Sequence, residues 1–407
     1  MIYRHAHFIV ATITTAILIV AITDAHKPIT SKYTYHQDVY PIFLNQCGGC
    51  HSADAVAPMS LLTYEDAYPW AQSIKEEVVN LTMPPWQAEY GFGAFKHEGS
   101  LTARQLDIVV EWANGGTPEG ITTNHDPGEP KNTWSLGEPT FILEMPEPFS
   151  LPADVSEATR HFVMPAAFDG ETMIRAVDFR PGTAAIVRSA ILYVDLSGEA
   201  AALDAADPAP GFDAENPNSL AGAQILTAWL PGQEAIGLDQ AGYVVPVGAD
   251  LVLRLNYKKT WTYEGLEVDD QSLLALYAAD PGVARVESIV LQPPTENGSN
   301  EGPLVSFSSH LSRDLDLLAI LPNLEADALG VQIEAVAING ERTPVIRLAS
   351  PRPEWRTRYW LDEPLRLTQG TTLEVQAILR SGSAEGNVPV SFTLDLLPVQ
   401  IPTAEPN

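Results

Sequence analysis

The sequence is poor in cysteine, in basic residues and in long apolar runs, and each shortage narrows the class of protein. Two cysteines in 407 residues argue against a disulfide scaffold. Lys and Arg number 23 against 52 Asp and Glu, and a net charge of −29 would repel the phosphates of nucleic acid. The hydrophobic fraction of 45% still suffices for large cores, so we expect two or three domains of about 150 residues.

An apolar run lies close to the N-terminus. Residues 8–22 follow Arg4 and end before Asp24, a layout that is typical of a secretory signal. The run is short for a full membrane span, which needs about 20 apolar residues. Residues 1–26 are therefore predicted to be a signal peptide, with an uncleaved membrane anchor through residues 8–22 as the alternative. Both interpretations place the remaining chain outside the cytoplasm, as a periplasmic or exported protein.

Both cysteines lie in one five-residue string, CGGCH, at residues 47–51. This spacing is typical of c-type haem attachment, in which Cys47 and Cys50 form thioethers to the haem and His51 binds the iron. A zinc site would need a second C-x-x-C pair, which the sequence does not contain. A thioredoxin-like pair would follow a strand and would leave His51 without a role. We therefore predict one covalent haem c.

A low-spin haem needs a sixth ligand, and methionine is the ligand that raises the potential. Met83 is followed by a proline pair that stiffens the loop and prevents a helix there. Met59 is only eight residues beyond His51, which is too close to reach the opposite haem face. Met83 is thus the predicted second axial ligand, and His97 is the alternative, giving a bis-histidine haem.

Helical patterns flank these motifs. Residues 35–45 carry Val39, Ile42 and Phe43 at helical spacing before the CGGCH string. A second helix is expected from residue 100 to Trp112, before a glycine pair that stops it. Together with the methionine loop, these helices predict a small all-α mono-haem cytochrome c domain over residues 30–120.

The pattern changes after a Pro- and Gly-rich linker at residues 121–139. Short alternating runs separated by turn residues predict antiparallel strands, and hence two all-β, jelly-roll-like sandwiches over 140–280 and 281–400. Residues 198–242, rich in Ala, Asp, Pro and Gly, are expected to form a surface loop. The expected strands are 140–145, 172–179, 185–194, 251–257, 273–278, 283–291, 304–308, 315–321, 331–338, 345–348, 356–361, 371–379 and 388–397.

The whole order resembles bacterial proteins that fuse a cytochrome c to the copper type II, ascorbate-dependent monooxygenase fold. Peptidylglycine hydroxylating and dopamine β-monooxygenases are members of that family. The resemblance extends over nearly the full chain. The stretches that carry it are Ala57–Ala67, Met83–Trp86, Trp134–Pro139, Ile174–Gly182, Trp229–Gly232 and Glu363–Leu367.

The family binds two copper ions with histidines and one methionine, and this sequence lacks those ligands. No methionine follows Met173, and His161 and His310 are expected to pack or to hydrogen-bond as ordinary side chains. Copper is therefore not expected, and no catalytic residue is assigned. The positions that the resemblance gives to histidines read Ile-Val-Arg-Ser-Ala-Ile at 186–191, Asn-Tyr-Lys at 256–258 and Pro-Asn-Leu-Glu at 322–325.

These observations favour an exported mono-haem c-type cytochrome that transfers single electrons. The metal-free sandwiches would dock a redox partner protein, such as a basic cytochrome, or place the haem within a membrane respiratory complex. Two alternatives stay open. One is a copper-dependent monooxygenase with an attached cytochrome donor, and the other is a structural subunit of a membrane redox complex.

Overall fold

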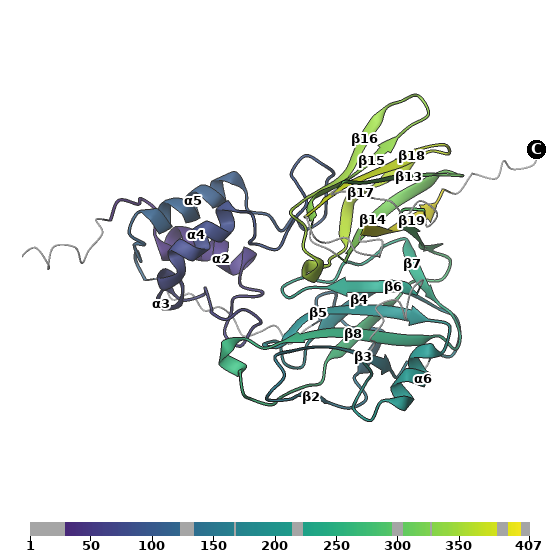
Figure 1. Cartoon of the computed structure of the whole chain (residues 1–407), viewed down its shortest axis with the longest axis horizontal. Helices are drawn as coiled ribbons and strands as arrows, with labels where there is room; N and C mark the ends of the chain where they lie inside the picture. The colour runs from purple at the N-terminus through teal and green to yellow at the C-terminus, as the bar shows by residue number, and fades with distance from the viewer. Residues whose placement is uncertain are drawn as a thin grey trace, which may run out of the picture. The chain divides into compact units, whose positions relative to one another are not determined.

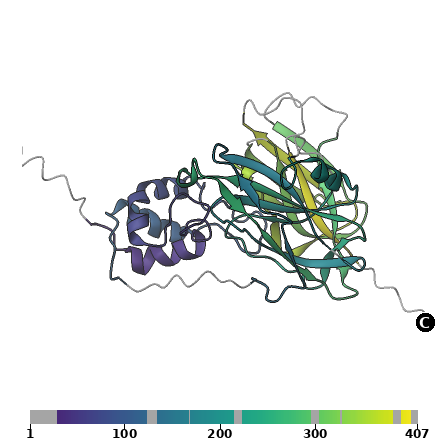
Figure 2. The ribbon, with the colours of Figure 1, turned by 90° about the horizontal axis from the view of Figure 1, so that it is seen from below.

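The computed structural model describes residues 29–122, 134–166, 168–213, 223–294, 304–325, 328–380 and 390–399. The predicted signal or anchor at residues 1–26 lies outside these ranges. The chain divides into two compact units, one helical and one rich in strands (Figures 1 and 2). The helical unit comprises the described parts of Met1–Cys47, Leu61–Pro84 and Leu101–Pro127, and the strand-rich unit comprises those of Gly48–Ser60, Pro85–Ser100 and Gly128–Asn407. Within the described residues, no helix is long and apolar enough to span a membrane.

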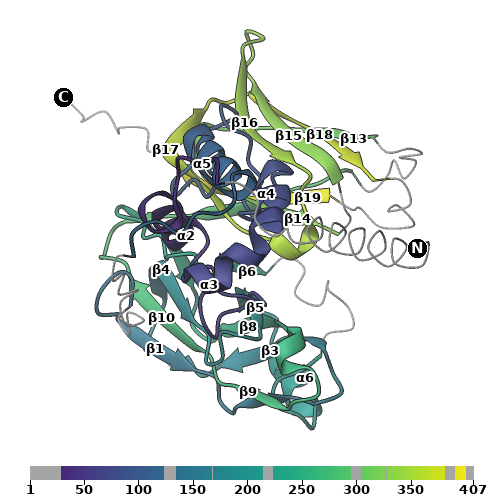
Figure 3. The same cartoon turned by 90° about the vertical axis from the view of Figure 1, so that its left-hand side faces the viewer.

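The helical unit is built around aromatic side chains. Tyr35, Phe43 and Trp112 are buried, with ring centroids of Trp112 6.1 Å from those of the other two. Helix α4 packs against α5 (Figure 3). The two helices predicted on either side of the CGGCH string are confirmed. The elements are η1 (Tyr35–Val39), α2 (Tyr40–Gln46), α3 (Tyr64–Ala67), η2 (Tyr68–Trp70), α4 (Ala71–Val79) and α5 (Ala103–Asn114).

Local sequence fixes both ends of α5. The Thr102 hydroxyl accepts from the Gln105 N–H, while the Gln105 side chain accepts from the Thr102 N–H, which satisfies two otherwise unpaired donors. The helix ends at Gly115, as the glycine pair predicts. Its buried face carries Val109 and Trp112, so the helix closes the aromatic core.

The first sandwich packs a five-stranded sheet, in the order β1-β10-β4-β7-β11, against a four-stranded sheet, in the order β3-β8-β5-β6. Buried side chains from both sheets, such as Val177, Leu276, Leu192 and Leu253, form one core. The strands are β1 (Phe141–Glu144), β10 (Leu273–Ala278), β4 (Thr172–Arg180), β7 (Ala241–Val245), β11 (Ala284–Arg285), β3 (Glu157–Met164), β8 (Asp250–Lys258), β5 (Val187–Asp195) and β6 (Gln224–Trp229), with the separate pair β2 (Phe149–Leu151) and β9 (Val268–Asp270).

The second sandwich packs two four-stranded sheets, in the orders β12-β19-β14-β17 and β13-β18-β15-β16. Ile320, Phe392, Val331 and Val375 belong to its core. The prediction of strand-rich sandwiches after residue 140 is confirmed. The strands are β12 (Glu287–Leu291), β19 (Val390–Pro398), β14 (Leu315–Leu324), β17 (Tyr359–Leu367), β13 (Leu304–His310), β18 (Thr372–Leu379), β15 (Ala328–Val336) and β16 (Arg342–Ala349).

The expected surface loop over residues 198–242 is wrong, because it contains helix α6 (Glu199–Ala206) and strand β6. The Asp195 carboxylate accepts from the Ala200 N–H (3.1 Å) and so holds the first turn of α6. In β6, Ile225, Leu226 and Ala228 are buried. The turn residues on either side of these short elements concealed them in the sequence.

A buried ion pair of the second sandwich makes hydrogen bonds to groups of the first sandwich. Arg358 Nε lies 2.9 Å from Asp395 Oδ2, with side-chain exposures of 3% and 0%. Arg358 also donates to the carbonyls of Ile225 and Leu226 on β6 (2.7 and 2.8 Å). The Tyr243 hydroxyl, on β7, donates to Asp395 Oδ2 (2.9 Å). Groups from both sandwiches thus satisfy one buried pair of charges.

Replacing Arg358 with methionine should destabilise the strand-rich unit by about 3–5 kcal/mol, because Asp395 would remain buried without its counter-ion. Urea unfolding of full-length protein, followed by fluorescence, measures this loss. Arg285→Met is the matched control, since Arg285 and Glu171 form an exposed pair (61% and 46%) that is worth at most about 1 kcal/mol. Equal losses in the two variants would contradict the role assigned to the buried pair.

Candidate haem-binding site

Cys47 lies at the carboxyl end of α2 in the helical unit. Its N–H donates to the Phe43 carbonyl (2.9 Å), so the residue completes the last turn of the helix. The glycine pair that follows, residues 48 and 49, favours the end of the helix there. Both cysteines are thiols, half-buried in the structure.

Cys50 belongs to residues 48–60, which we call the haem-motif segment and which are part of the strand-rich unit. The Cys50 thiol donates to the Pro231 carbonyl (3.3 Å) in the turn after β6. A Cβ atom on Gly49 would lie 2.4 Å from the Cα of Gly232, so only glycine fits at this position of the motif. The segment therefore contacts the first sandwich through its backbone as well as its thiol.

The imidazole of His51 is oriented by a backbone acceptor. Its Nδ1 lies 3.1 Å from the carbonyl oxygen of Met59. A carbonyl can only accept, so Nδ1 carries the hydrogen and Nε2 keeps its lone pair. Burial lowers the pKa of His51, while this hydrogen bond opposes the shift. A neutral imidazole with a free Nε2 lone pair is the form that binds a metal.

Met59 thus takes part in the site through its carbonyl and not through its sulfur. The sequence pattern excludes the Met59 thioether as an iron ligand, and it predicts no role for the Met59 backbone. Residues 57–59 read Ala-Pro-Met, and the Ala57 N–H donates back to the Cys50 carbonyl (3.0 Å). This bond closes a loop that contains His51. The spacing of side chains in a sequence carries no signal for such backbone contacts.

Arg188, on β5, is a cation beside this segment. Its Nη1 donates to the Val56 carbonyl and its Nε donates to the Lys258 carbonyl (3.2 Å). Burial raises the pKa of the Cys50 thiol to about 11, against the opposing effect of the positive charge of Arg188. Burial also lowers the pKa of Arg188, and the nearby Cys50 opposes that shift.

Met83, the predicted second axial ligand, lies in the helical unit in the turn after α4. Its N–H and that of Thr82 both donate to the Glu77 carbonyl (3.3 and 3.0 Å), which ties the turn to the end of the helix. The alternative ligand His97 is exposed and has a φ of +53°. The role of Met83 as an iron ligand stays a prediction.

The positions that the resemblance assigns to copper ligands hold paired polar groups. The Lys258 ammonium pairs with Glu157 on β3 (3.1 Å). Asn323 accepts from the Arg356 guanidinium and donates to the Thr393 hydroxyl (3.1 Å). In the described part of the chain, no three His, Cys, Asp or Glu side chains form a group that could hold a metal ion.

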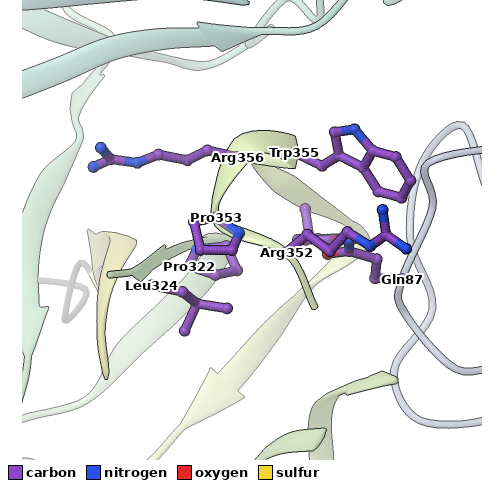
Figure 4. A pocket seen from close by; sticks show the side chains of 8 residues that line it. Gln87, Pro322, Leu324, Arg352, Pro353, Trp355 and Arg356 are labelled. Atoms are coloured by element: carbon purple, nitrogen blue, oxygen red, sulfur yellow. The ribbon is translucent and has the colours of Figure 1, made fainter. Parts of the chain in front are cut away.

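A small pocket lies at the Pro322–Leu324 position, and Figure 4 shows the side chains around it. Arg352 and Arg356 extend in opposite directions, so their charges do not converge on one point. Arg352 stacks over the Trp355 ring, 4.9 Å from its centroid. This arrangement gives no set of converging ligands for an ion.

His161 and His310 contact Phe212 and Thr372, which are not residues of the haem-motif segment. His161, on β3, is buried and stacks on the Phe212 ring, 5.1 Å between centroids. Burial, together with the positive charge of Arg254, lowers the pKa of His161 to about 4. His310, on β13, is exposed, and its Nδ1 lies 2.8 Å from the Thr372 hydroxyl.

Acidification should weaken the fold through His161. Its pKa is lowered from 6.5 to about 4 in the folded protein, so the unfolded chain binds the proton more readily. Stability then falls as the pH drops from about 6.5 to 4, by about 3 kcal/mol for this group. Urea unfolding at pH 7 and pH 4 should show a smaller loss in His161→Leu than in the wild type. His310→Leu is the control, which should lose as much stability between pH 7 and pH 4 as the wild type. If His161→Leu also lost as much stability as the wild type, the prediction would be refuted.

No family model matches this chain, and no curated protein matches it. Solved structures give remote similarity only. PNGF-II, in one crystal form, is 10% identical with a TM-score of 0.27, and the match covers 63% of this chain and 65% of that chain. The major capsid protein P2 of bacteriophage PM2 is 10% identical with a TM-score of 0.24, and the match covers 64% of this chain and 98% of that chain.

Proposed function

We propose that this chain is an exported c-type cytochrome that carries one covalent haem and transfers single electrons. The observation that carries the proposal is the tautomer of His51. Its Nδ1 hydrogen is directed to the Met59 carbonyl (3.1 Å), so its Nε2 lone pair is available to a metal. In the sequence, His51 follows directly on the two cysteines of the CGGCH string. Once both thiols form thioethers, His51 is the side chain of that string left to bind the haem iron.

The donor set fits haem c in its chemistry. Cys47 and Cys50 would each hold the haem through a thioether to one vinyl group, an addition that needs no oxidant. The neutral imidazole of His51 would supply a nitrogen ligand to the iron, and the thioether of Met83 would supply a sulfur ligand. When bound, the haem supplies the one-electron redox chemistry.

In this proposal the polypeptide holds, orients and shields the haem. In this proposal residues 30–120 form the cytochrome c domain. The closed aromatic core of Tyr35, Phe43 and Trp112 keeps the helices rigid. Rigid ligands limit the rearrangement that accompanies a change of one electron, and a methionine ligand gives a high potential.

The two sandwiches act in this proposal as a metal-free module for docking or placement. Arg188 and Lys258 lie at positions where the resemblance places copper ligands. Both side chains are cations, which repel a metal ion. The side chain of Asn323 is already engaged by Arg356 and Thr393. The acidic chain, with its net charge of −29, would attract a basic redox partner such as a soluble cytochrome.

The decisive measurement is the haem itself. Full-length protein produced with haem-attachment machinery should give a c-type pyridine haemochrome spectrum at one haem per chain. Cys47→Ala/Cys50→Ala should lose all covalent haem, because no thiol remains to form a thioether. Ser197→Ala is a control variant in the first sandwich that should retain the full haem content.

The metal content distinguishes this function from the copper alternative. Elemental analysis of the same preparation should find iron at one equivalent and substoichiometric copper. Stoichiometric copper with ascorbate-dependent hydroxylation would sink the electron-transfer proposal. A chain that carries no covalent haem under these conditions would sink it as well.

Met83→Ala should remove the long-wavelength methionine-to-iron absorption band of the oxidised protein and lower its potential, because the thioether favours reduced iron. Met59→Ala is the matched control, since the Met59 backbone carbonyl, not its side chain, contacts His51. Visible spectra and redox titration measure both effects. A band that survives in Met83→Ala would assign the ligand elsewhere, with His97→Ala as the next variant to examine.

A further inference from the structure

The haem-motif segment, residues 48–60, is held against the first sandwich at two separate places. In one of them, Arg188 donates to the Val56 carbonyl and to the Lys258 carbonyl. Val56 belongs to the segment, whereas Lys258 ends β8, the strand paired with β5 that carries Arg188. One guanidinium therefore joins two backbone carbonyls that are 202 positions apart in the chain (258 minus 56).

Arginine is suited to this task. A guanidinium presents five N–H donors in a fixed plane, and it stays charged even when partly buried. A lysine ammonium has one compact head and cannot hold its two acceptors in a planar fork. Carbonyl oxygens accept strong hydrogen bonds from a charged donor, so both contacts favour the observed placement of the segment.

The Val56 contact is linked to His51 by a short path of backbone hydrogen bonds. The Ala57 N–H, from the residue next to Val56, donates to the Cys50 carbonyl (3.0 Å). Two residues further on, the Met59 carbonyl accepts from His51 Nδ1 (3.1 Å). Release of Val56 would therefore loosen the loop that orients the imidazole.

The second place of contact is independent of Arg188. Gly49 and Gly232 approach so closely that a Cβ on Gly232 would lie 3.0 Å from the Cα of Gly49. Gly232 also has a φ of +82°, which side chains rarely adopt. The Cys50 thiol reaches the Pro231 carbonyl in the same turn. This turn supports the beginning of the segment, and Arg188 supports its middle.

We propose that Arg188 is a positioning residue, which fastens the haem-motif segment to strands β5 and β8 and thereby fixes the orientation of the His51 imidazole. The first sandwich then takes part in setting the redox balance of the haem. Only this last consequence rests on the proposed function, because the fastening itself is a property of the polypeptide.

The fastening is tested by hydrogen–deuterium exchange of full-length protein, read on peptides that cover residues 52–60. Arg188→Gln and Arg188→Lys should both speed exchange there about tenfold, since both lose the forked contact. Lys258→Gln is the matched control, because it removes a neighbouring charge and keeps the carbonyl that Arg188 binds. Wild-type exchange in both Arg188 variants would overturn the proposal.

The redox consequence is tested on the haem-loaded variants at a fixed ambient potential. Arg188→Lys keeps the charge, yet we expect its ratio of reduced to oxidised protein to fall about threefold. A looser segment admits water, which favours the more highly charged oxidised form. A wild-type ratio in Arg188→Lys, with equal falls in Arg188→Gln and Lys258→Gln, would show a distant charge effect and overturn the positioning role.

Two further comparisons keep the outcomes distinct. If the protein carries no haem c, the proposed function fails, while the exchange data still decide whether Arg188 fastens the segment. If Arg188→Gln does not fold, Arg188→Lys carries the test together with Gly232→Ala. The latter should speed exchange in the same peptides, because the added Cβ presses on Gly49.

Discussion

The strand-rich unit depends on one buried pair of charges, Arg358 and Asp395. Two ions in an apolar interior are tolerated only where further polar groups complete their shells. Here those groups come from β6 and β7 in the first sandwich and from β12 in the second, where the Ser288 hydroxyl donates to Asp395 Oδ1 (2.6 Å). Both charges belong to the second sandwich, so sliding of the first sandwich would leave the ion pair itself intact. It would take the Ile225 and Leu226 carbonyls away from Arg358. It would also take the Tyr243 hydroxyl away from Asp395, so these hydrogen bonds favour one arrangement of the two sandwiches.

The turn after β6 connects the residues around this ion pair to the haem-motif segment. Gln233, in this turn, donates from Nε2 to the Thr357 hydroxyl (2.7 Å), one residue before Arg358. Its Oε1 accepts from the Leu230 N–H (3.1 Å), which shapes the turn that contains Pro231 and Gly232. The surface that receives Gly49 and Cys50 is therefore held by the same corner of the second sandwich that supplies the buried cation. Core packing, turn geometry and the placement of the segment form one continuous chain of contacts.

Some of this could be predicted from the sequence, and the reason differs between residues. Helix α5 has a complete set of local signals, from the Thr102–Gln105 capping box to the stop at Gly115. Strands β13, β15 and β18 alternate buried with more exposed positions, which is also a local signal. Strand β6 was missed because its six residues are flanked by turn-forming residues. The CGGCH string predicts a haem site. No sequence pattern predicts the roles of the Met59 and Val56 carbonyls, since every residue has a carbonyl and only the fold decides which one is used.

Arg188 lies where the resemblance leads us to expect a histidine ligand, and in the structure this arginine makes a contact of its own. Read as a sequence, an arginine at that position only argues against a bound cation. In the fold, its charge is directed at two carbonyls, one of which belongs to the haem-motif segment. The half-buried Cys50 thiol donates to the Pro231 carbonyl of the same sandwich. Arg188 therefore has a structural role at this position, because its charged, planar guanidinium donates to two backbone acceptors at once.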